Sequence, residues 1–420
     1  MATDHLVVAD WIASFVFLYP LLMAYIWVIG AVAYYLHYER HSVTVDSGLP
    51  LLRSLPRVSV LVPCFNESAH VLEVFEALGK LDYPNYEVVA INDGSTDNTA
   101  VLLDGLLERY SWLRVLHQDR NQGKAVALNT GALLAQGEYL MCIDGDSLLA
   151  PDAIPWLLRH FQNSPRVGAV TGNPRIRNRS SLLGRIQVGE FSSIVGLIKR
   201  SQRTYGRLFT ASGVVAMFRR RALLHAGFWS KDILTEDIDI SWKLQTHHWD
   251  VRFEPRALCW ILMPETLRGL WKQRLRWAMG GIQSVLKYLW IVRAWKQRRM
   301  WPILIEYFVS VIWAYAAVAM ILIGLIGLVV PLPHLLQISL IPGWCGMLLC
   351  TTSLLQLFTA SILDRHYDDR LWQSYFWAIW YPLVFWLVTA TTTVVALPRV
   401  LLRQRGLRAI WVSPDRGYGS

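Results

Sequence analysis

Two aspartates separated by a single residue, Asp144 and Asp146, follow the apolar run YLMCI at residues 139–143. On an extended strand, side chains at positions i and i+2 point to the same face, so the two carboxylates would lie close together. Like charges at this spacing repel unless a cation lies between them, and hard divalent cations prefer carboxylate oxygens. The pair is therefore a candidate metal site, and an ordinary Asp-Gly turn is the alternative.

Two further acidic motifs could bind a nucleotide or act as a general base. Asp93 lies in NDGSTD, residues 92–97, where its carboxylate could accept hydrogen bonds from a ribose or a nucleobase. The same letters also make a good turn and helix N-cap. Asp237 ends the triplet TED before the helical pattern IDISWKLQ and could act as a general base. A capping box before a surface helix is the alternative there, and Asp239 is an equally ordinary acid at a helix start.

The stretch QRLRW, residues 273–277, is basic and lies among many tryptophans. Arg276 could hold a diphosphate, because the planar guanidinium matches phosphate oxygens. Trp277 could support a sugar ring. The alternative is an anchor at the membrane surface, where Arg and Trp are common.

The composition indicates a membrane protein with one catalytic-sized domain. Of the 420 residues 54% are apolar, 20 are Trp and 17 are Tyr, which is more apolar than an ordinary soluble protein. The net charge of +10 fits an anionic lipid face or a phosphorylated substrate. We expect no nucleic-acid partner, because no basic block is interleaved with aromatic residues. The five cysteines form no CxxC pair, which favours reduced thiols and a cytosolic domain.

Apolar segments long enough to cross a bilayer lie at both ends of the chain. Residues 11–36, in an anchor over residues 1–40, precede Arg40, Arg53 and Arg57, so the charge rule puts the N-terminus outside. The C-terminal region 301–398 holds three such segments, at residues 303–330, 335–363 and 374–397. Three crossings would place the basic tail, residues 399–420, outside, against the same rule. Either one segment is re-entrant or split, or the tail lies outside, and we favour a cytosolic tail.

Residues 57–262 alternate between buried strands and amphipathic helices, which predicts an α/β domain with a mostly parallel sheet. The expected strands are residues 58–63, 86–93, 113–118 and 139–146. Ligands of such sheets bind beyond the carboxyl ends of the strands, where the polar clusters fall. Residues 181–200 and 263–300 mix apolar residues with Arg, Lys and Trp, and we expect helices on the membrane surface there. Core helices are the alternative.

Taken together, the order of these motifs resembles that of the processive family 2 glycosyltransferases, which are inverting, membrane-embedded polysaccharide synthases. The closer resemblance is to the bacterial poly-β-1,6-N-acetyl-D-glucosamine synthases, which make a biofilm exopolysaccharide. It covers nearly the whole chain and is carried by VPCFNE, NDGSTD, NQGKAVAL, CIDGDSLL, LTEDIDISWKLQ, the segment ending in KQRLRWA, and WVSPDRG. The fold it implies is a GT-A (nucleotide-diphospho-sugar transferase) domain flanked by transmembrane and interfacial helices. Some relatives carry an additional N-terminal apolar segment.

The resemblance also implies roles for individual residues of this chain. It implies that Asp93 and Glu67 bind the uridine, that Lys124 lies near the nucleotide, and that Asp144 contacts the ribose or diphosphate. It also implies that Asp146, with Asp144, holds Mg²⁺ or Mn²⁺, and that Asp237, with Glu236 beside it, is catalytic. Gln273, Arg276 and Trp277 would bind the diphosphate and the acceptor end.

The implied activity is processive transfer of N-acetylglucosamine from UDP-GlcNAc to a growing β-1,6-linked chain, coupled to translocation across the bacterial inner membrane. The implied partners are membrane lipid and a small membrane subunit activated with cyclic di-GMP, although the sequence holds no cyclic di-GMP motif that we can identify. Two alternatives stay open. The chain could make another polysaccharide or a lipid-linked sugar, or it could be a catalytically silent export scaffold, which would not need all of these acids.

Overall fold

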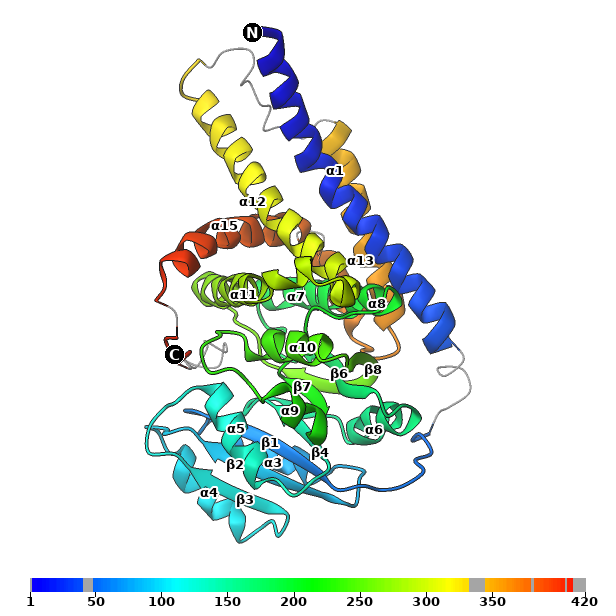
Figure 1. Cartoon of the computed structure of the whole chain (residues 1–420), viewed down its shortest axis with the longest axis vertical. Coiled ribbons are helices and arrows are strands. Elements are labelled where there is room, and N and C mark those ends of the chain that lie inside the picture. The colour runs from blue at the N-terminus through cyan, green and yellow to red at the C-terminus, as the bar shows by residue number, and fades with distance from the viewer. Residues whose placement is uncertain (1, 41–47, 332–343, 379–380, 405, 411–420) are drawn as a thin grey trace.

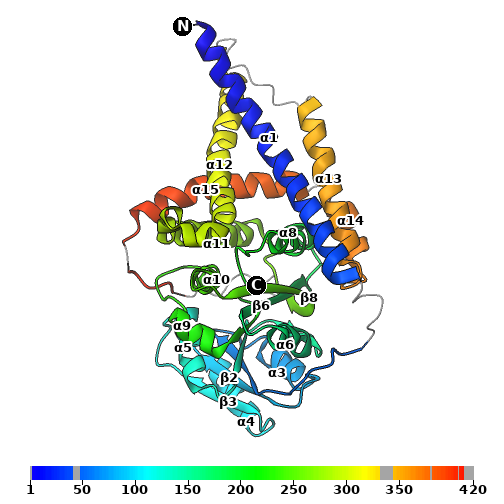
Figure 2. The same ribbon diagram turned by 45° about the vertical axis from the view of Figure 1, so that its right-hand side comes forward.

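The computed structural model describes residues 2–40, 48–331, 344–378, 381–404 and 406–410. An α/β domain lies at one end of the molecule and long helices project from it at the other (Figure 1). A layer of shorter helices separates the two parts, as the turned view confirms (Figure 2).

The α/β domain is built on one eight-stranded sheet with the order β3-β2-β1-β4-β7-β6-β8-β5. Its first half is parallel, because β1 pairs with both β2 and β4, and β2 pairs with β3. These strands are β1 (Val58–Cys64), β2 (Tyr86–Asn92), β3 (Leu113–His117) and β4 (Tyr139–Ile143). All four expected strands are present, although β4 ends at Ile143 and not at residue 146. Their valine- and isoleucine-rich sequences suit a sheet covered on both faces.

The second half of the sheet is mixed. Strand β7 runs antiparallel to both β4 and β6, whereas β8 is parallel to β6 and antiparallel to the short β5. These strands are β5 (Leu148–Leu149), β6 (Val167–Ile176), β7 (Val215–Arg219) and β8 (Asp250–Ile261). None of β6, β7 and β8 was among the strands expected from the sequence.

Helices cover both faces of the sheet with separate hydrophobic cores. One core joins β1 and β4 to α3 (Val71–Leu78), α4 (Thr99–Leu107) and α6 (Ala153–Asn163). The other lies against α5 (Lys124–Leu134), α9 (Arg220–Ala226) and α10 (Glu236–Thr246). Two of these helices, α5 and α10, begin with candidate site residues.

The intermediate layer contains α7 (Leu182–Glu190), a π-helical segment η2 (Phe191–Leu197), α8 (Ile198–Thr204) and α11 (Leu267–Lys287). Two 3₁₀ segments, η3 (Leu289–Arg293) and η4 (Trp295–Met300), follow α11. Most side chains of the α7–α8 stretch are buried within the protein, including Gln187, Lys199 and Arg200. The expectation of a surface helix over residues 181–200 is therefore wrong, and the alternative of core helices holds.

Four helices are long and apolar enough to cross a membrane: Asp10–Glu39, Trp295–Gly327, Trp344–Asp364 and Val384–Leu402. They correspond to α1 (Ala2–Tyr34) with η1 (Tyr35–Glu39), to η4 with α12 (Trp301–Gly327), to α13 (Trp344–Asp364) and to α15 (Tyr381–Leu402). The short η6 (Leu371–Ser374) and α14 (Tyr375–Ala378) precede α15. The first part of the expected 335–363 segment, up to residue 343, lies outside the described residues.

The directions of these helices differ. Helices α1, α12 and α13 run along the long axis of the molecule, whereas α15 lies across it beside α11 in both views (Figures 1 and 2). After α15 the chain returns to the α/β domain. There the amide of Ala409 donates to the carbonyl of Lys231 at 2.9 Å, and Arg408 Nη1 donates to Gln122 Oε1 at 3.2 Å.

A buried ion-pair network connects the long helices to the sheet. Arg200 on α8 pairs with Glu39 of η1 at 2.6 Å and with Asp364 at the end of α13 at 2.8 Å. Asp364 also pairs with Arg175 of β6 at 2.6 Å. Because these charges are buried, each depends on its partners for stability.

Candidate active site

Asp93 lies directly after β2 and is fully buried. Its two carboxylate oxygens accept hydrogen bonds from the amides of Gln122 at 2.8 Å and Gly123 at 2.9 Å. Burial raises the pKa of the Asp93 carboxyl, and the two amides act in the opposite direction. The loop before α5 is thereby fixed to the end of β2.

Glu67 follows β1 and is also fully buried. Its amide donates to Thr99 Oγ1 at 2.8 Å, which joins this loop to the start of α4. Its side chain faces the DGD motif, since a Cβ placed on Gly145 would come within 3.0 Å of Glu67 Cγ. The ends of β1, β2 and β4 therefore meet at one edge of the sheet, as the sequence predicts.

Asp144 and Asp146 lie in a turn and not on the strand itself. Strand β4 ends at Ile143, and the amide of Ser147 donates to the carbonyl of Asp144 at 3.1 Å. The expectation of an extended strand through both acids is therefore wrong, and the local conformation is that of the alternative, an Asp-Gly turn, because the chain reverses here to enter β5. Asp146 is buried and accepts a hydrogen bond from Ser147 Oγ at 3.2 Å.

Lys124, the first residue of α5, joins this turn to α10. Its Nζ lies 2.5 Å from Asp144 Oδ1 and 3.1 Å from Glu236 Oε1. Burial alone would lower the pKa of Lys124, but Asp144 and Glu236 outweigh it and the net shift is upward. The ammonium group therefore stays charged, and it neutralises two acids that lie far apart in the sequence.

Asp237 lies in the first turn of α10, next to Glu236. Its Oδ2 accepts from the amide of Gly213 at 3.2 Å, and its Oδ1 accepts from the amide of Ile238 at 2.9 Å. Burial and then the Glu236 charge raise the pKa of Asp237, while Lys124 opposes them. A carboxyl with a raised pKa is a stronger base than an ordinary aspartate, which suits it to proton transfer.

Asp239 has a structural environment that differs from that of Asp237. It is fully buried, pairs with Lys287 at 2.6 Å and accepts from Tyr288 Oη at 3.1 Å. These contacts tie α10 to the end of α11.

The QRLRW stretch lies on α11, and this helix contacts the loop that carries the TED motif. The Oε1 atom of Gln283 accepts from the amide of Leu234 at 3.0 Å, and a Cβ on Gly280 would overlap with Thr235. Trp277, one turn earlier, packs against Phe191 with ring centroids 6.5 Å apart. The part of α11 that follows the motif therefore contacts the loop before α10.

The other two residues of the predicted diphosphate site have different surroundings. Gln273 Nε2 lies 3.8 Å from the sulfur of Met263, and Arg276 is exposed. No ion pair of Arg276 occurs within the described part of the chain. Its guanidinium thus faces outward and is accessible to a ligand.

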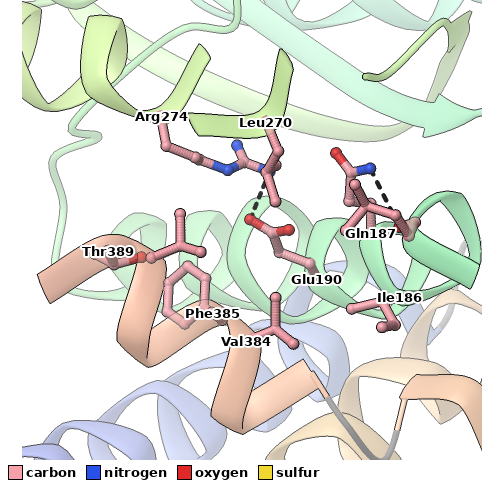
Figure 3. A pocket seen from close by; sticks show the side chains of 10 residues that line it. Ile186, Gln187, Glu190, Leu270, Arg274, Val384, Phe385 and Thr389 are labelled. Atoms are coloured by element: carbon pink, nitrogen blue, oxygen red, sulfur yellow. Dashed lines mark hydrogen bonds and ion pairs between the residues drawn. The ribbon is translucent and has the colours of Figure 1, made fainter. Parts of the chain in front are cut away.

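A buried ion pair that involves a residue of this motif could not be predicted from the sequence. Arg274 of α11 pairs with Glu190 of α7 at 2.7 Å, and its guanidinium lies 4.1 Å from the ring centroid of Trp277. Phe385 and Thr389 of α15 lie on the other side of Glu190 (Figure 3). The free volume between the three helices is about 10 Å³, room for about one water. No local pattern pairs these two residues, because they are far apart in the chain.

Lys199 is a second buried charge that no motif indicated. Its Nζ donates to Ser212 Oγ at 2.6 Å and to Thr171 Oγ1 at 3.1 Å. Burial lowers the pKa of Lys199 to about 7, against an opposing effect of the Asp237 charge. Ser212 precedes Gly213, whose amide binds Asp237, so this lysine supports the loop around the candidate base.

The sequence of this chain matches a known protein family. Residues 56–280 match the model of the family described as "Glycosyltransferase like family 2", which covers the sheet, α10 and the QRLRW motif. The chain belongs to glycosyltransferase family 2. The predicted GT-A fold and enzyme class are thereby confirmed, and the α/β domain is a glycosyltransferase domain.

Full-length relatives agree with this assignment. The chain is 36% identical over 411 residues to a poly-β-1,6-N-acetyl-D-glucosamine synthase of Staphylococcus epidermidis, covering 97% of this chain and 98% of that protein. It is also 36% identical over 408 residues to a synthase of the same name from Staphylococcus aureus strain COL, covering 96% and 98%.

A solved structure shares the fold of the whole chain. It is a mannosyltransferase of Pyrobaculum calidifontis in complex with GDP-mannose and Mn²⁺, with a TM-score of 0.63. The alignment covers 95% of this chain and 99% of that protein at 20% identity. The similarity therefore includes the long helices as well as the glycosyltransferase domain.

The carboxylates predicted to hold a metal ion are Asp144 and Asp146. Within the described ranges, no group of three or more His, Cys, Asp or Glu side chains is placed to hold a metal. Two carboxylates alone suit a hard cation such as Mg²⁺, which is commonly held by one or two carboxylates together with substrate phosphates and water.

Proposed function

We propose that this glycosyltransferase transfers N-acetylglucosamine from UDP-GlcNAc to the end of a growing β-1,6-linked poly-N-acetylglucosamine chain. The observation that carries the proposal is the 36% identity, over 97% of the chain, to a synthase named for that polymer. The continuous cluster from Asp93 through Lys124 to Asp237 supplies the groups that such a reaction needs.

The nucleotide would bind at the ends of β1 and β2. Asp93 and Glu67 are held there by backbone contacts, so they form a fixed surface for the uridine. Lys124 lies at the start of α5, where its charge and the helix N-terminus both favour the approach of phosphate oxygens. Asp144 beside it would contact the ribose or the diphosphate.

A divalent ion, Mg²⁺ or Mn²⁺, would be held by Asp146 with Asp144. When bound, it would neutralise charge that develops on the departing diphosphate. Asp144 would then interact with both Lys124 and the ion. This is compatible with its contact to Lys124, because a carboxylate can accept from several partners.

Asp237 would act as the general base. It would remove the proton from the acceptor O6 as that oxygen attacks C1 of the sugar from the face opposite UDP, which inverts the anomeric centre. One base suffices because the diphosphate leaves without needing a proton, unlike the leaving group of glycoside hydrolases. Glu236, bound to Lys124, would maintain the raised pKa of Asp237.

The acceptor end would lie along α11. The Trp277 ring, which Arg274 covers on one side, would offer its remaining face to a sugar, and Gln273 and Arg276 lie on the same helix. The exposed guanidinium of Arg276 is accessible to phosphate oxygens. Since α11 contacts the loop before Glu236, one helix could bring the diphosphate and the sugar chain to the base.

The helix directions support a particular threading of the membrane. If α1, α12 and α13 cross and α15 lies along the surface, an N-terminus outside leaves both the glycosyltransferase domain and the tail in the cytosol. The contact of Ala409 with Lys231 agrees with this arrangement. The enzyme would then be a multi-pass protein of the bacterial inner membrane that moves its product outward.

The same proposal includes a partner: a small membrane subunit, activated with cyclic di-GMP, would work with this enzyme.

The test is the product formed in membranes that contain the full chain. Radiolabelled UDP-GlcNAc should yield a polymer that a β-1,6-specific N-acetylglucosaminidase degrades, and UDP-glucose should yield none. The proposal fails if label enters only a lipid-linked sugar, or if the polymer resists that hydrolase and is cut by a β-1,4-specific one.

A further inference from the structure

A second cavity, of about 210 Å³, lies apart from the site described above. It is enclosed by η1 at the end of the first long helix and by α6, α8 and the first half of β8. Its walls carry four arginines: Arg159, Arg203, Arg252 and Arg256. The volume is far above the roughly 10–15 Å³ that one water requires. A cavity of this size can hold a small anionic group.

The carboxylates that line this cavity are bound to other groups. Glu254 interacts with His160 at 2.8 Å and accepts from the amide of Arg256 at 3.1 Å. Glu39 pairs with Arg200, which lies outside the cavity, at 2.6 Å. No ion pair of Arg159 or Arg203 occurs in the part of the chain that the structure describes. Arg252 has one long ion pair, with Asp250 at 3.9 Å. The four arginines still outnumber the acids that could neutralise them, so the cavity has an excess of positive charge.

Several guanidinium N–H groups in the wall have no acceptor. Among the described residues, nothing accepts from Arg252 Nε or from the two Nη atoms of Arg256, and all three atoms are buried. Arg256 stacks on Trp156 with its charge 4.2 Å from the ring centroid, which orients the guanidinium but satisfies none of these donors. Burial and then the Arg203 charge lower the pKa of Arg252. Buried donors and like charges of this kind are costly without a partner.

We propose that this cavity binds the negatively charged phosphate group of a ligand. Arginine is suited to this role because its fork of N–H donors matches two phosphate oxygens. Tyr34 and Tyr38, at the end of the first long helix, form part of the wall. Basic pockets at the cytoplasmic ends of such helices are where anionic lipid head groups bind. A soluble phosphate offers the same chemistry.

The test uses the full chain purified in a neutral detergent. Short-chain phosphatidylglycerol, short-chain phosphatidylcholine and inorganic phosphate are each titrated, and the thermal unfolding temperature reports binding. Phosphatidylglycerol should raise this temperature and phosphatidylcholine should not. A parallel rise with millimolar inorganic phosphate would identify soluble phosphate as a sufficient ligand, whereas its absence would identify the lipid.

The double variant Arg203→Gln/Arg252→Gln should lower the apparent affinity for the anion by about tenfold or more. Arg298→Gln is the matched control, because this arginine is exposed on η4, outside the cavity, and its loss should leave binding unchanged. If the double variant is poorly folded, Arg159→Gln on α6 should weaken binding several-fold.

A second measurement does not depend on any ligand. In phosphate-free buffer, Arg252→Gln should unfold at the same temperature as the unmodified protein or at a higher one, because the repulsion from Arg203 that it removes outweighs the lost 3.9 Å pair with Asp250. The proposal is overturned if neither phosphatidylglycerol nor phosphate shifts unfolding relative to phosphatidylcholine. It is equally overturned if the arginine variants bind the anion as tightly as the unmodified protein.

Discussion

At the scale of single residues, the chemistry depends on the charges around Asp237. Burial and Glu236 raise the pKa of this carboxyl, and Lys124 holds it back from a larger rise. Lys124 in turn keeps its proton because it pairs with both Asp144 and Glu236. The proposed base Asp237, its neighbour Glu236 and Lys124 are therefore electrostatically linked.

This linkage predicts a change in the pH dependence of turnover. As the proposed base, Asp237 must be deprotonated to accept a proton, so activity should fall as the pH drops through its raised pKa. Glu236→Gln removes a negative neighbour, which lowers the pKa of Asp237 and should move the acidic limb of kcat to lower pH. The measurement is kcat against pH at saturating UDP-GlcNAc.

Glu138→Gln, at an exposed position on the same domain, is the control and should leave the profile unchanged. An acidic limb that stays in place or moves to higher pH in Glu236→Gln would contradict the linkage. If Glu236→Gln abolished turnover at every pH while Asp237→Asn retained it, the two acids would exchange roles.

At the scale of elements, α11 positions the catalytic loop through a close contact at Gly280. A Cβ there would overlap with the side chain of Thr235, the residue before Glu236. Glycine inside a helix normally costs about 0.5–1 kcal/mol relative to alanine, so this glycine is retained at the expense of helix stability. The close approach of the two elements is the physical reason.

We therefore expect Gly280→Ala to lower kcat by about tenfold or more, because small displacements of catalytic groups are costly. Overpacking should also destabilise the protein by about 1–3 kcal/mol. Gly105→Ala on α4 is a matched control, since a Cβ there meets nothing within 4 Å. That variant should gain up to about 1 kcal/mol in stability and keep its kcat. Equal kcat values for the two variants would exclude a positioning role for this contact.

The parts of the site that could be predicted from the sequence are those with local signals. Asp93, Asp144 and Asp237 each follow or begin a regular element, and parallel topology brings strand ends together. The DGD motif was expected on an extended strand, with an Asp-Gly turn as the alternative, and the structure has the turn. The following strand β5 is only two residues long and leaves little periodicity to detect. Lys199 and the pair of Arg274 with Glu190 depend on tertiary contacts between distant segments, so no local pattern could indicate them.

The same distinction applies to the fold. The parallel half of the sheet follows from repeated strand and helix patterns, each with its own hydrophobic period. The mixed half depends on how β7 inserts between β4 and β6, which is set by long-range pairing. The apolar helices could be predicted from the length and composition of their segments, but the direction of α15 could be learned only from its packing beside α11.

At the scale of the whole molecule, a network of buried ion pairs holds the long helices on the glycosyltransferase domain. Arg200 joins η1 to α13, and Asp364 extends the network to Arg175 in the sheet. Movement of the helices relative to the active site would have to break these pairs. The network therefore couples the two parts of the molecule mechanically.

Removal of Arg200 should be strongly destabilising. Arg200→Leu leaves Glu39 without this partner and Asp364 with one fewer, and breaking a buried ion pair in this way costs about 3–5 kcal/mol. The exposed pair of Lys80 with Glu76 at 2.8 Å provides the control, because Lys80→Ala should cost at most about 0.5 kcal/mol. Thermal unfolding in detergent compares the two variants. Similar unfolding temperatures would show that the buried network does not hold the long helices in place.

Asp237 is proposed to remove the proton from the acceptor while other groups bind the nucleotide. The measurement is made on Asp237→Asn in parallel with Asp232→Asn, a change at an exposed aspartate in the preceding loop. Asp237→Asn should bind UDP-GlcNAc within about twofold of the unmodified protein and lose polymer synthesis by about 10²–10⁴-fold, the usual contribution of a general base. Asp232→Asn should retain both activities. Polymer synthesis by Asp237→Asn at the unmodified rate would contradict the account.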